Sequence, residues 1–169
     1  MRFSESDACY VTTELGRAPQ GVVGVASRNR EGQPAVIINL PLIQQGEKWL
    51  PFPTLYWLVD PSLNAKIADI ERTGGVGEIE RALMASQDLM QAHRADNVFY
   101  AMARWAVLND REKQAANDLG LHPILEASGI GGVANHDAVK CLHAQYAFHL
   151  ARHEVGTTVG KLMHQRYGL

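Results

Sequence analysis

The sequence predicts a single α+β domain over residues 1–169, in which an N-terminal three-stranded antiparallel sheet is followed by a C-terminal helical bundle packed on it. Three observations predict this arrangement. Short runs rich in β-branched residues occupy the first part of the chain, apolar residues at helical spacing occupy the rest, and no repeat or long linker divides it. Strands first and helices afterwards are typical of α+β proteins rather than of alternating βαβ units.

Three apolar runs predict the strands. Residues 21–26 (GVVGVA) and 35–40 (AVIINL) are separated by a polar, glycine-containing stretch, which predicts a β-hairpin with a long loop. A third run at 55–59 (LYWLV) follows Pro51 and Pro53, whose rings exclude a helix immediately before it. Three strands in succession favour an antiparallel sheet.

The period of the pattern changes to that of a helix at Asp60 and Pro61. These two residues suit the N-cap and first-turn positions of a helix that is expected to end at Gly74 and Gly75. The same apolar spacing predicts four further helices, at residues 76–91, 96–118, 137–153 and a short last one bracketed by Gly156 and Gly160. These helices are expected to pack on the sheet.

Composition and charge exclude several classes of protein. Lys and Arg number 16 against 18 Asp and Glu, a net charge of −2, so no overall field attracts nucleic acid or an anionic membrane. No apolar run approaches the roughly 20 residues of a membrane helix, and the N-terminus lacks an export signal. Cys9 and Cys141 form neither a CxxC motif nor a zinc pattern, so a reducing cytoplasm is the expected compartment.

A glycine-rich stretch at residues 129–132 is the first candidate for a binding site. Gly129, Gly131 and Gly132 allow the backbone to approach a ligand closely. Lys140 is expected in the first turn of the helix from residue 137, where free N–H groups favour an anion. The GxxxxGK[ST] spacing is absent, which argues against P-loop nucleotide hydrolysis. The alternative is a flexible turn with Lys140 in solvent.

His143 is the second candidate. On a helical projection it shares an apolar face with Tyr146 and Leu150, which predicts a buried imidazole that needs polar partners. Such a ring could transfer a proton at the floor of a pocket, or could be a structural histidine bonded to a backbone carbonyl. Cys141 lies two residues earlier and is expected to point in nearly the opposite direction, which argues against a Cys–His pair.

Other candidate contacts are less specific. Arg28 in the hairpin loop could add charge to an anion site, and Tyr56 could form a wall of the pocket, although such residues are more often solvated or core. His149 and His153 have the i,i+4 spacing that can chelate a metal, but no third ligand is evident, so no metal site is predicted. The sequence assigns no cofactor.

Several segments resemble the DUF501 family of uncharacterised bacterial proteins over residues 34–160. The resemblance is carried by PFPTLYWL at 51–58 and VKCLHA at 139–144, with Pro61, Leu63, Ile70, Glu71, Gly74 and GIGG at 129–132. It implies a cysteine around residues 26–36 and another at Asp60, and histidines at Gln145 and Phe148, where this chain has other residues. This chain does match the family pattern at Lys140, Cys141 and His143.

The resemblance brings no established activity, but it implies gene neighbours of exopolyphosphatase and cell-division type and hence phosphate-rich ligands. The leading hypothesis is a cytoplasmic protein with a phosphate-type anion site, and in its enzymatic version the protein acts on a phosphorylated or polyphosphate-like metabolite. In it Lys140 neutralises charge and His143 transfers a proton. One alternative is a non-catalytic module or homodimeric adaptor using residues 51–57, and another is thiol chemistry at Cys141.

Overall fold

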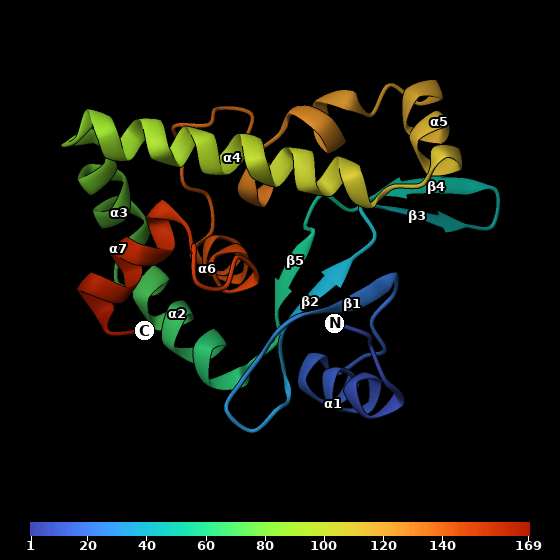
Figure 1. The fold of residues 1–169 in the computed structure, drawn as a ribbon, viewed down its shortest axis with the longest axis horizontal. Coiled ribbons are helices and arrows are strands. Elements are labelled where there is room, and N and C mark those ends of the chain that lie inside the picture. Colours follow the sequence, from blue (N-terminus) through green and yellow to red (C-terminus); the bar gives the residue numbers. More distant parts are fainter.

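The computed structural model describes residues 1–169 and confirms the α+β fold class (Figure 1). A three-stranded antiparallel sheet has the order β1-β2-β5, formed by β1 (Val22–Arg28), β2 (Pro34–Asn39) and β5 (Tyr56–Leu58). In register, Ile37 of β2 lies between Val25 and Trp57. The predicted hairpin and the third strand are therefore both present.

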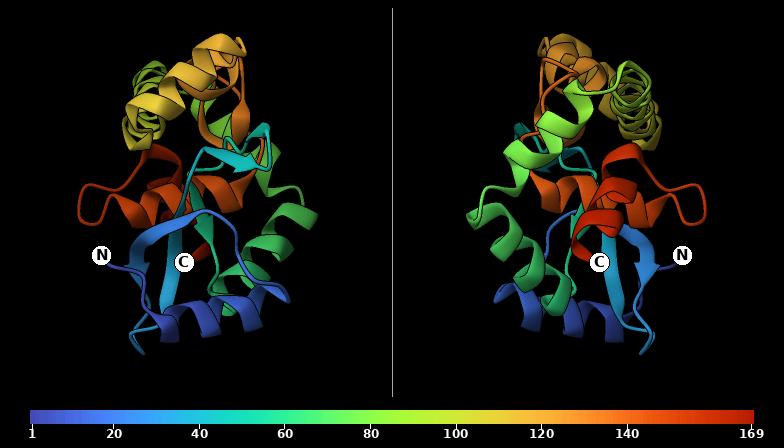
Figure 2. Two further views of the ribbon diagram at one scale, coloured as in Figure 1. Left: turned by 90° about the vertical axis from the view of Figure 1, so that its right-hand side faces the viewer. Right: turned by 90° about the vertical axis from the view of Figure 1, so that its left-hand side faces the viewer.

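The sheet is covered on both faces, because successive side chains of a strand point to opposite sides. Val36 packs in the main core with residues of the C-terminal helices, whereas its neighbour Ile37 packs with Val11 of α1 (Glu5–Leu15). Figure 2 shows α1 (dark blue) at one end of the molecule and the long helix α4 (Gln87–Val107) at the other. The sheet lies between them.

Helix α1 was not predicted, because its apolar periodicity is weak. Its start is nevertheless encoded by a capping box, in which Ser4 and Asp7 bond each other's backbone N–H groups. Asp7 also accepts two hydrogen bonds from Arg28, at 2.7 and 2.9 Å. This ion pair joins α1 to the end of β1.

The predicted helix at residue 60 is confirmed as α2 (Pro61–Arg72), with Asp60 accepting from Leu63 N–H as its N-cap. The continuous helices predicted at 76–91 and 96–118 are wrong. The chain forms α3 (Gly75–Met84), α4, and α5 (Asp110–Asp118) instead. The breaks occur where Ser86 and Asn109 cap the next helix with their side chains, a signal that the apolar spacing concealed.

A small hairpin and two short helical turns complete the first three-quarters of the chain. Strands β3 (Leu42–Gln45) and β4 (Lys48–Pro51) form a separate sheet that sequence patterning did not predict. The turns are η1 (Pro123–Ala127) and η2 (Ile130–Gly132). Leu42 of β3 and Leu125 of η1 form a satellite core with Leu108, at the end of α4, and Ala116 of α5.

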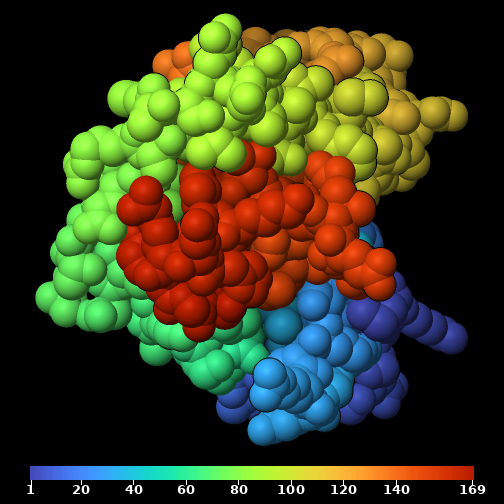
Figure 3. Space-filling view, turned by 60° about the vertical axis from the view of Figure 1, so that its left-hand side comes forward, coloured from blue at the N-terminus to red at the C-terminus, as the bar shows by residue number.

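Helix α6 (Leu142–Ala151) lies at the centre of the molecule (Figure 1). Its buried residues Leu142, Tyr146 and Ala147 belong to the main core, which also draws on β1, β2, β5, α2, α3 and α7 (Thr158–Tyr167). Figure 3 shows the C-terminal segment (red) at the surface, between α4 (yellow-green) and α2 (green). The last helix is not bracketed by Gly156 and Gly160 as predicted, because Gly160 lies within α7.

His149 fixes the junction between α6 and α7. Its ring is buried, its Nδ1 accepts the Thr157 N–H at 2.9 Å, and it stacks on Tyr146. A Cβ atom at Gly160 would lie 2.1 Å from the ring and one at Gly156 would lie 2.6 Å from it, so both positions require glycine. Burial lowers the pKa of His149 to about 4, with a further contribution from nearby His164.

This low pKa predicts that acid destabilises the fold through His149. The unfolded chain takes up a proton near the ordinary pKa of 6.5 and the folded chain does so near 4. The free energy of unfolding should therefore fall between pH 6.5 and 4, by about 2–3 kcal/mol from this residue. In His149→Asn the new Oδ1 can accept the Thr157 N–H, and urea denaturation should show a smaller loss of unfolding free energy over this pH range. An equal loss in the variant and the unaltered chain would contradict this assignment.

Candidate functional site

The segment before α6 is extended, so the predicted helix from residue 137 is wrong. Cys141 is the N-cap, with φ −150° and ψ 120°, and its side chain makes no capping hydrogen bond. The first N–H group of the helix and one N–H of the preceding extended segment are bonded by other helices. Glu71 of α2 accepts from Leu142 N–H at 2.5 Å, and Glu80 of α3 accepts from Val139 N–H at 3.0 Å.

This start brings Cys141 and His143 together and overturns the expectation that they diverge. The helical projection does not apply to Cys141, because the residue lies outside the helix. The Cys141 thiol, the His143 ring and the Glu71 carboxylate each offer one ligand atom, and these three atoms lie within 4.8 Å of one another. We call these three residues the Glu71–Cys141–His143 cluster.

His143 has an acceptor at each ring nitrogen. Nδ1 lies 3.2 Å from Glu71 Oε2, and Nε2 lies 3.2 Å from the backbone carbonyl of Asn64. The Cys141 side chain raises the pKa of His143, burial opposes this, and Asn64 and Glu71 raise it further. The side chain is 27% exposed, so the ring predicted to be buried is only partly buried, and the buried histidine of α6 is His149.

A cavity of about 190 Å³ opens beside the cluster. Five of the eight site residues chosen from the sequence line it, namely Tyr56, Gly131, Lys140, Cys141 and His143, together with Thr54, Trp57, Leu58 and Ala144. Lys140 is exposed and precedes the helix, which corrects its predicted place in the first turn. We call this cavity the cluster pocket.

The three glycines have different roles. Gly131 has φ +71° and lines the cluster pocket, and a Cβ added there would lie 3.7 Å from Lys140 Cβ. Gly129 lies against Asn97, because an added Cβ would be 2.3 Å from Asn97 Oδ1. Gly132 has φ +77°, and a Cβ added there would first meet Pro53, at 3.9 Å. Neither Gly129 nor Gly132 lines the cluster pocket, so these two serve packing and turn geometry.

Two buried polar residues of α4 shape the pocket. Asn97 accepts from Ile130 N–H at 2.8 Å and donates to the carbonyl of His136 at 3.0 Å, which holds both ends of the glycine loop. The guanidinium of Arg104 is fully buried and donates to the carbonyls of Pro53 and Leu125 and to Ser128. Both side chains thereby fix the segments that carry Gly131 and Thr54.

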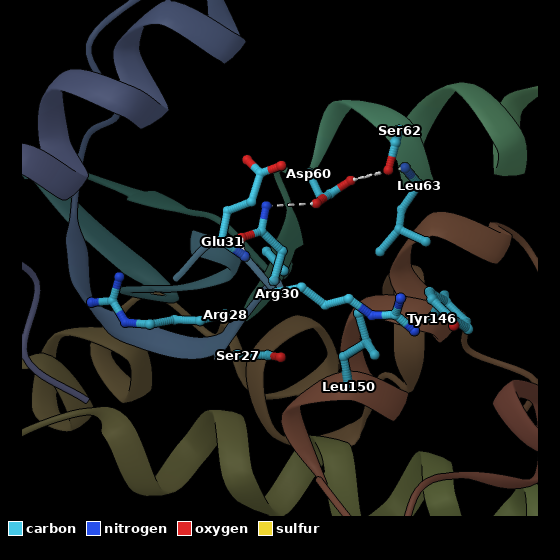
Figure 4. Close-up of a pocket in the computed structure, with 11 residues that line it drawn as sticks. Ser27, Arg28, Arg30, Glu31, Asp60, Ser62, Leu63, Tyr146 and Leu150 are labelled. Carbon is cyan, nitrogen blue, oxygen red and sulfur yellow. Dashed lines mark hydrogen bonds between the residues drawn. The ribbon is translucent and has the colours of Figure 1, made fainter. Parts of the chain in front are cut away.

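Arg28 lies at a different place. It is held by Asp7 and by the carbonyl of Gly32, and it lines a separate cavity of about 510 Å³ between the β1–β2 loop, α2 and α6. Figure 4 shows Arg28 directed away from Tyr146, while Arg30 reaches towards that ring. Asp60, where the family resemblance implies a cysteine, accepts here from Asn29 and Ser62.

The spacing of His149 and His153 does not produce a chelating pair on one helix face. His149 Nδ1 is occupied by the Thr157 N–H, and His153 is exposed beyond the end of α6 with φ +48°. Sequence reasoning missed Glu71 and Asn64 as site residues. Glu71 appeared only within the family resemblance, and the backbone carbonyl of Asn64 leaves no signal in a sequence.

The fold and the site thus describe a small α+β protein with a thiol, an imidazole and a carboxylate gathered beside a pocket. Comparison with protein families gives a match to the family described as "Protein of unknown function (DUF501)" over residues 25–165. The chain belongs to this family. No curated protein and no solved structure matches it. No helix in the fold combines the length and apolar character needed to cross a membrane.

The contact between Gly129 and Asn97 predicts the effect of a methyl group at residue 129. Gly129→Ala should displace Asn97 Oδ1 from Ile130 N–H and lower the free energy of unfolding by about 2–4 kcal/mol. Gly77→Ala is the control, because its Cβ would meet nothing closer than 3.4 Å within α3. Urea denaturation measures both. A Gly129→Ala protein of unchanged stability that loses anion binding would restore Gly129 as a ligand residue.

Proposed function

We propose that the cluster pocket is the active site of a thiol-dependent enzyme that acts on a small anionic substrate, such as a phosphorylated metabolite. One observation carries the proposal. Cys141 stands at the N-cap of α6 with its sulfur within 4.8 Å of a ring nitrogen of His143, and Asn64 and Glu71 hold that ring in place. A thiol beside a histidine at a helix N-terminus is the usual environment of a reactive cysteine.

The chemistry follows from the two acceptors on His143. Because Glu71 and the Asn64 carbonyl both accept hydrogen bonds, the ring is best satisfied when both of its nitrogens carry protons. In the proposed reaction the Cys141 thiol passes its proton to His143 as the sulfur attacks the substrate. The positive end of the α6 dipole stabilises the negative charge that develops on the sulfur.

In the reaction, the thiolate forms a bond to the electrophilic phosphorus or carbon of the substrate. The leaving group departs with the bonding electron pair and takes its proton from the His143 imidazolium. Water then releases the transferred group from sulfur, with neutral His143 as the base. Lys140, at the mouth of the pocket, supplies positive charge for the anionic group.

The size of the pocket limits the substrate. A volume of about 190 Å³ is below the roughly 300–1,000 Å³ of pockets for drug-sized ligands, so a nucleotide is too large and a phosphorylated metabolite of a few carbons fits. The polar side chains of Thr54 and Tyr56 are available at the wall. A reducing cytoplasm is the compartment in which Cys141 would stay a thiol.

The alternative of an adaptor that uses residues 51–57 receives less support. Leu55 is fully buried and Tyr56 stacks on Phe148 at 5.5 Å between ring centroids, so these two residues stabilise the fold. Phe52 and Trp57 are half-buried and pack on each other at 5.7 Å. Formation of a homodimer through this segment stays a prediction.

Alkylation of the two cysteines tests the reactive thiol within one molecule. Cys9 is exposed on α1 and serves as the reference thiol. At pH 7 the less exposed Cys141 should nevertheless react faster with iodoacetamide than Cys9. His143→Gln should slow the alkylation of Cys141 by at least about tenfold and leave the alkylation rate of Cys9 unchanged. The proposal fails if Cys141 is the slower thiol in the metal-free folded protein.

Calorimetry with inorganic phosphate and with glycerol phosphate tests the anion site. Lys140→Gln should weaken binding by about tenfold, a loss of about 1.4 kcal/mol, because it removes the charge at the pocket mouth. Lys48→Gln, an exposed position on β4, should leave binding unchanged. Equal affinity in the Lys140→Gln protein and the unaltered chain would exclude Lys140 from the site.

A further inference from the structure

The cluster offers three different ligand types for one metal ion. We propose that Glu71, Cys141 and His143 bind a single Zn²⁺ ion, with the fourth coordination position open to the cluster pocket. The zinc site itself does not depend on the proposed enzyme activity. The effect of zinc on catalysis does rest on the proposed function, because a zinc ion bound to the Cys141 sulfur would hold the nucleophile inactive.

The distances support a metal site. The three ligand atoms lie within 4.8 Å of one another, and tetrahedral zinc requires them roughly 3–4 Å apart, given bonds of about 2.0–2.3 Å. Side-chain rotations at the half-exposed Glu71 and His143 can close that difference. The backbone need not move, since all three side chains already converge on one point.

The surroundings of the ligands match those of known metal sites in general. A histidine that binds metal through one nitrogen usually donates its other N–H to a carbonyl, and His143 Nε2 faces the carbonyl of Asn64 at 3.2 Å. This leaves Nδ1, which faces Glu71, for the metal. Glu71 Oε1 accepts from Leu142 N–H, so Oε2 is the oxygen directed at the cluster. Both ligands are therefore oriented by the backbone.

The donor set selects the metal. A thiolate sulfur and an imidazole nitrogen are soft and intermediate ligands, which suit Zn²⁺ and disfavour Mg²⁺ and Ca²⁺. Three protein ligands with an open fourth position are typical of accessible zinc sites rather than of closed structural ones. Cys141 and His143 both line the cluster pocket, so a water or a small anion in that pocket would complete the coordination.

Zinc titration of the reduced full-length protein tests the site, with a chromophoric chelator as competitor. A Cys9→Ser background removes the other thiol. One Zn²⁺ should bind per chain. Glu71→Gln should lower the zinc affinity by at least about tenfold, while the amide oxygen of the new side chain keeps the hydrogen bond from Leu142 N–H. Glu80→Gln, the same change at the carboxylate that bonds Val139 N–H, should bind zinc as the unaltered chain does. Circular dichroism checks that each variant is folded.

Protection from alkylation gives a second measurement. One equivalent of Zn²⁺ should slow the alkylation of Cys141 in the Cys9→Ser protein by at least about tenfold, and Glu71→Gln should largely abolish that protection. The inference is overturned if zinc binds the Glu71→Gln and Cys141→Ser proteins as tightly as the unaltered chain.

The two proposals fail separately. A Cys141 that reacts rapidly without metal but is not protected by zinc would overturn the metal site and leave the enzyme proposal intact. Slow alkylation of Cys141 in a chain that binds zinc tightly through Glu71 would overturn the enzyme proposal and leave the metal site intact.

Discussion

The carboxylate of Glu71 is the contact on which the candidate site depends. One oxygen accepts the Leu142 N–H at the start of α6, and the other faces His143 Nδ1 at 3.2 Å. The N-cap residue, Cys141, does not bond the first free N–H groups of the helix, as Ser, Thr, Asp or Asn would at this position. Glu71 of α2 bonds the first N–H of the helix, and the cysteine side chain, which makes no capping bond, lies beside the histidine instead.

The same contact couples the site to the hydrophobic core. Helix α2 contributes Ile67 and Ile70 to the main core, and α6 contributes Leu142 and Tyr146 to the same cluster. Packing fixes the two helices relative to each other, and Glu71 then lies at the edge of this packed interface. The positions of three reactive groups are therefore set by apolar packing together with two hydrogen bonds to the backbone. The Leu142 N–H donates to Glu71, and His143 donates to the Asn64 carbonyl.

A second set of buried polar contacts holds the opposite wall of the cluster pocket. Asn97 and Arg104 lie on α4 and bond the backbone of the glycine loop and of Pro53. Buried polar groups of this kind are costly when unpaired, so each of them restricts its loop to one conformation. Sequence patterning gave no signal for Arg104, because its partners are carbonyls far away in the chain.

The sequence by itself determined the fold class, the β1–β2 hairpin, the third strand and the cap of α2, because these depend on β-branched runs, prolines and an Asp–Pro pair within a few residues. It also selected five residues of the cluster pocket. Tertiary structure decided where α6 begins, and with it the meeting of Cys141 and His143, because Glu71 bonds Leu142 from 71 residues away in the chain. A helical projection assumes that the helix has already begun, and it gave the opposite geometry for that reason.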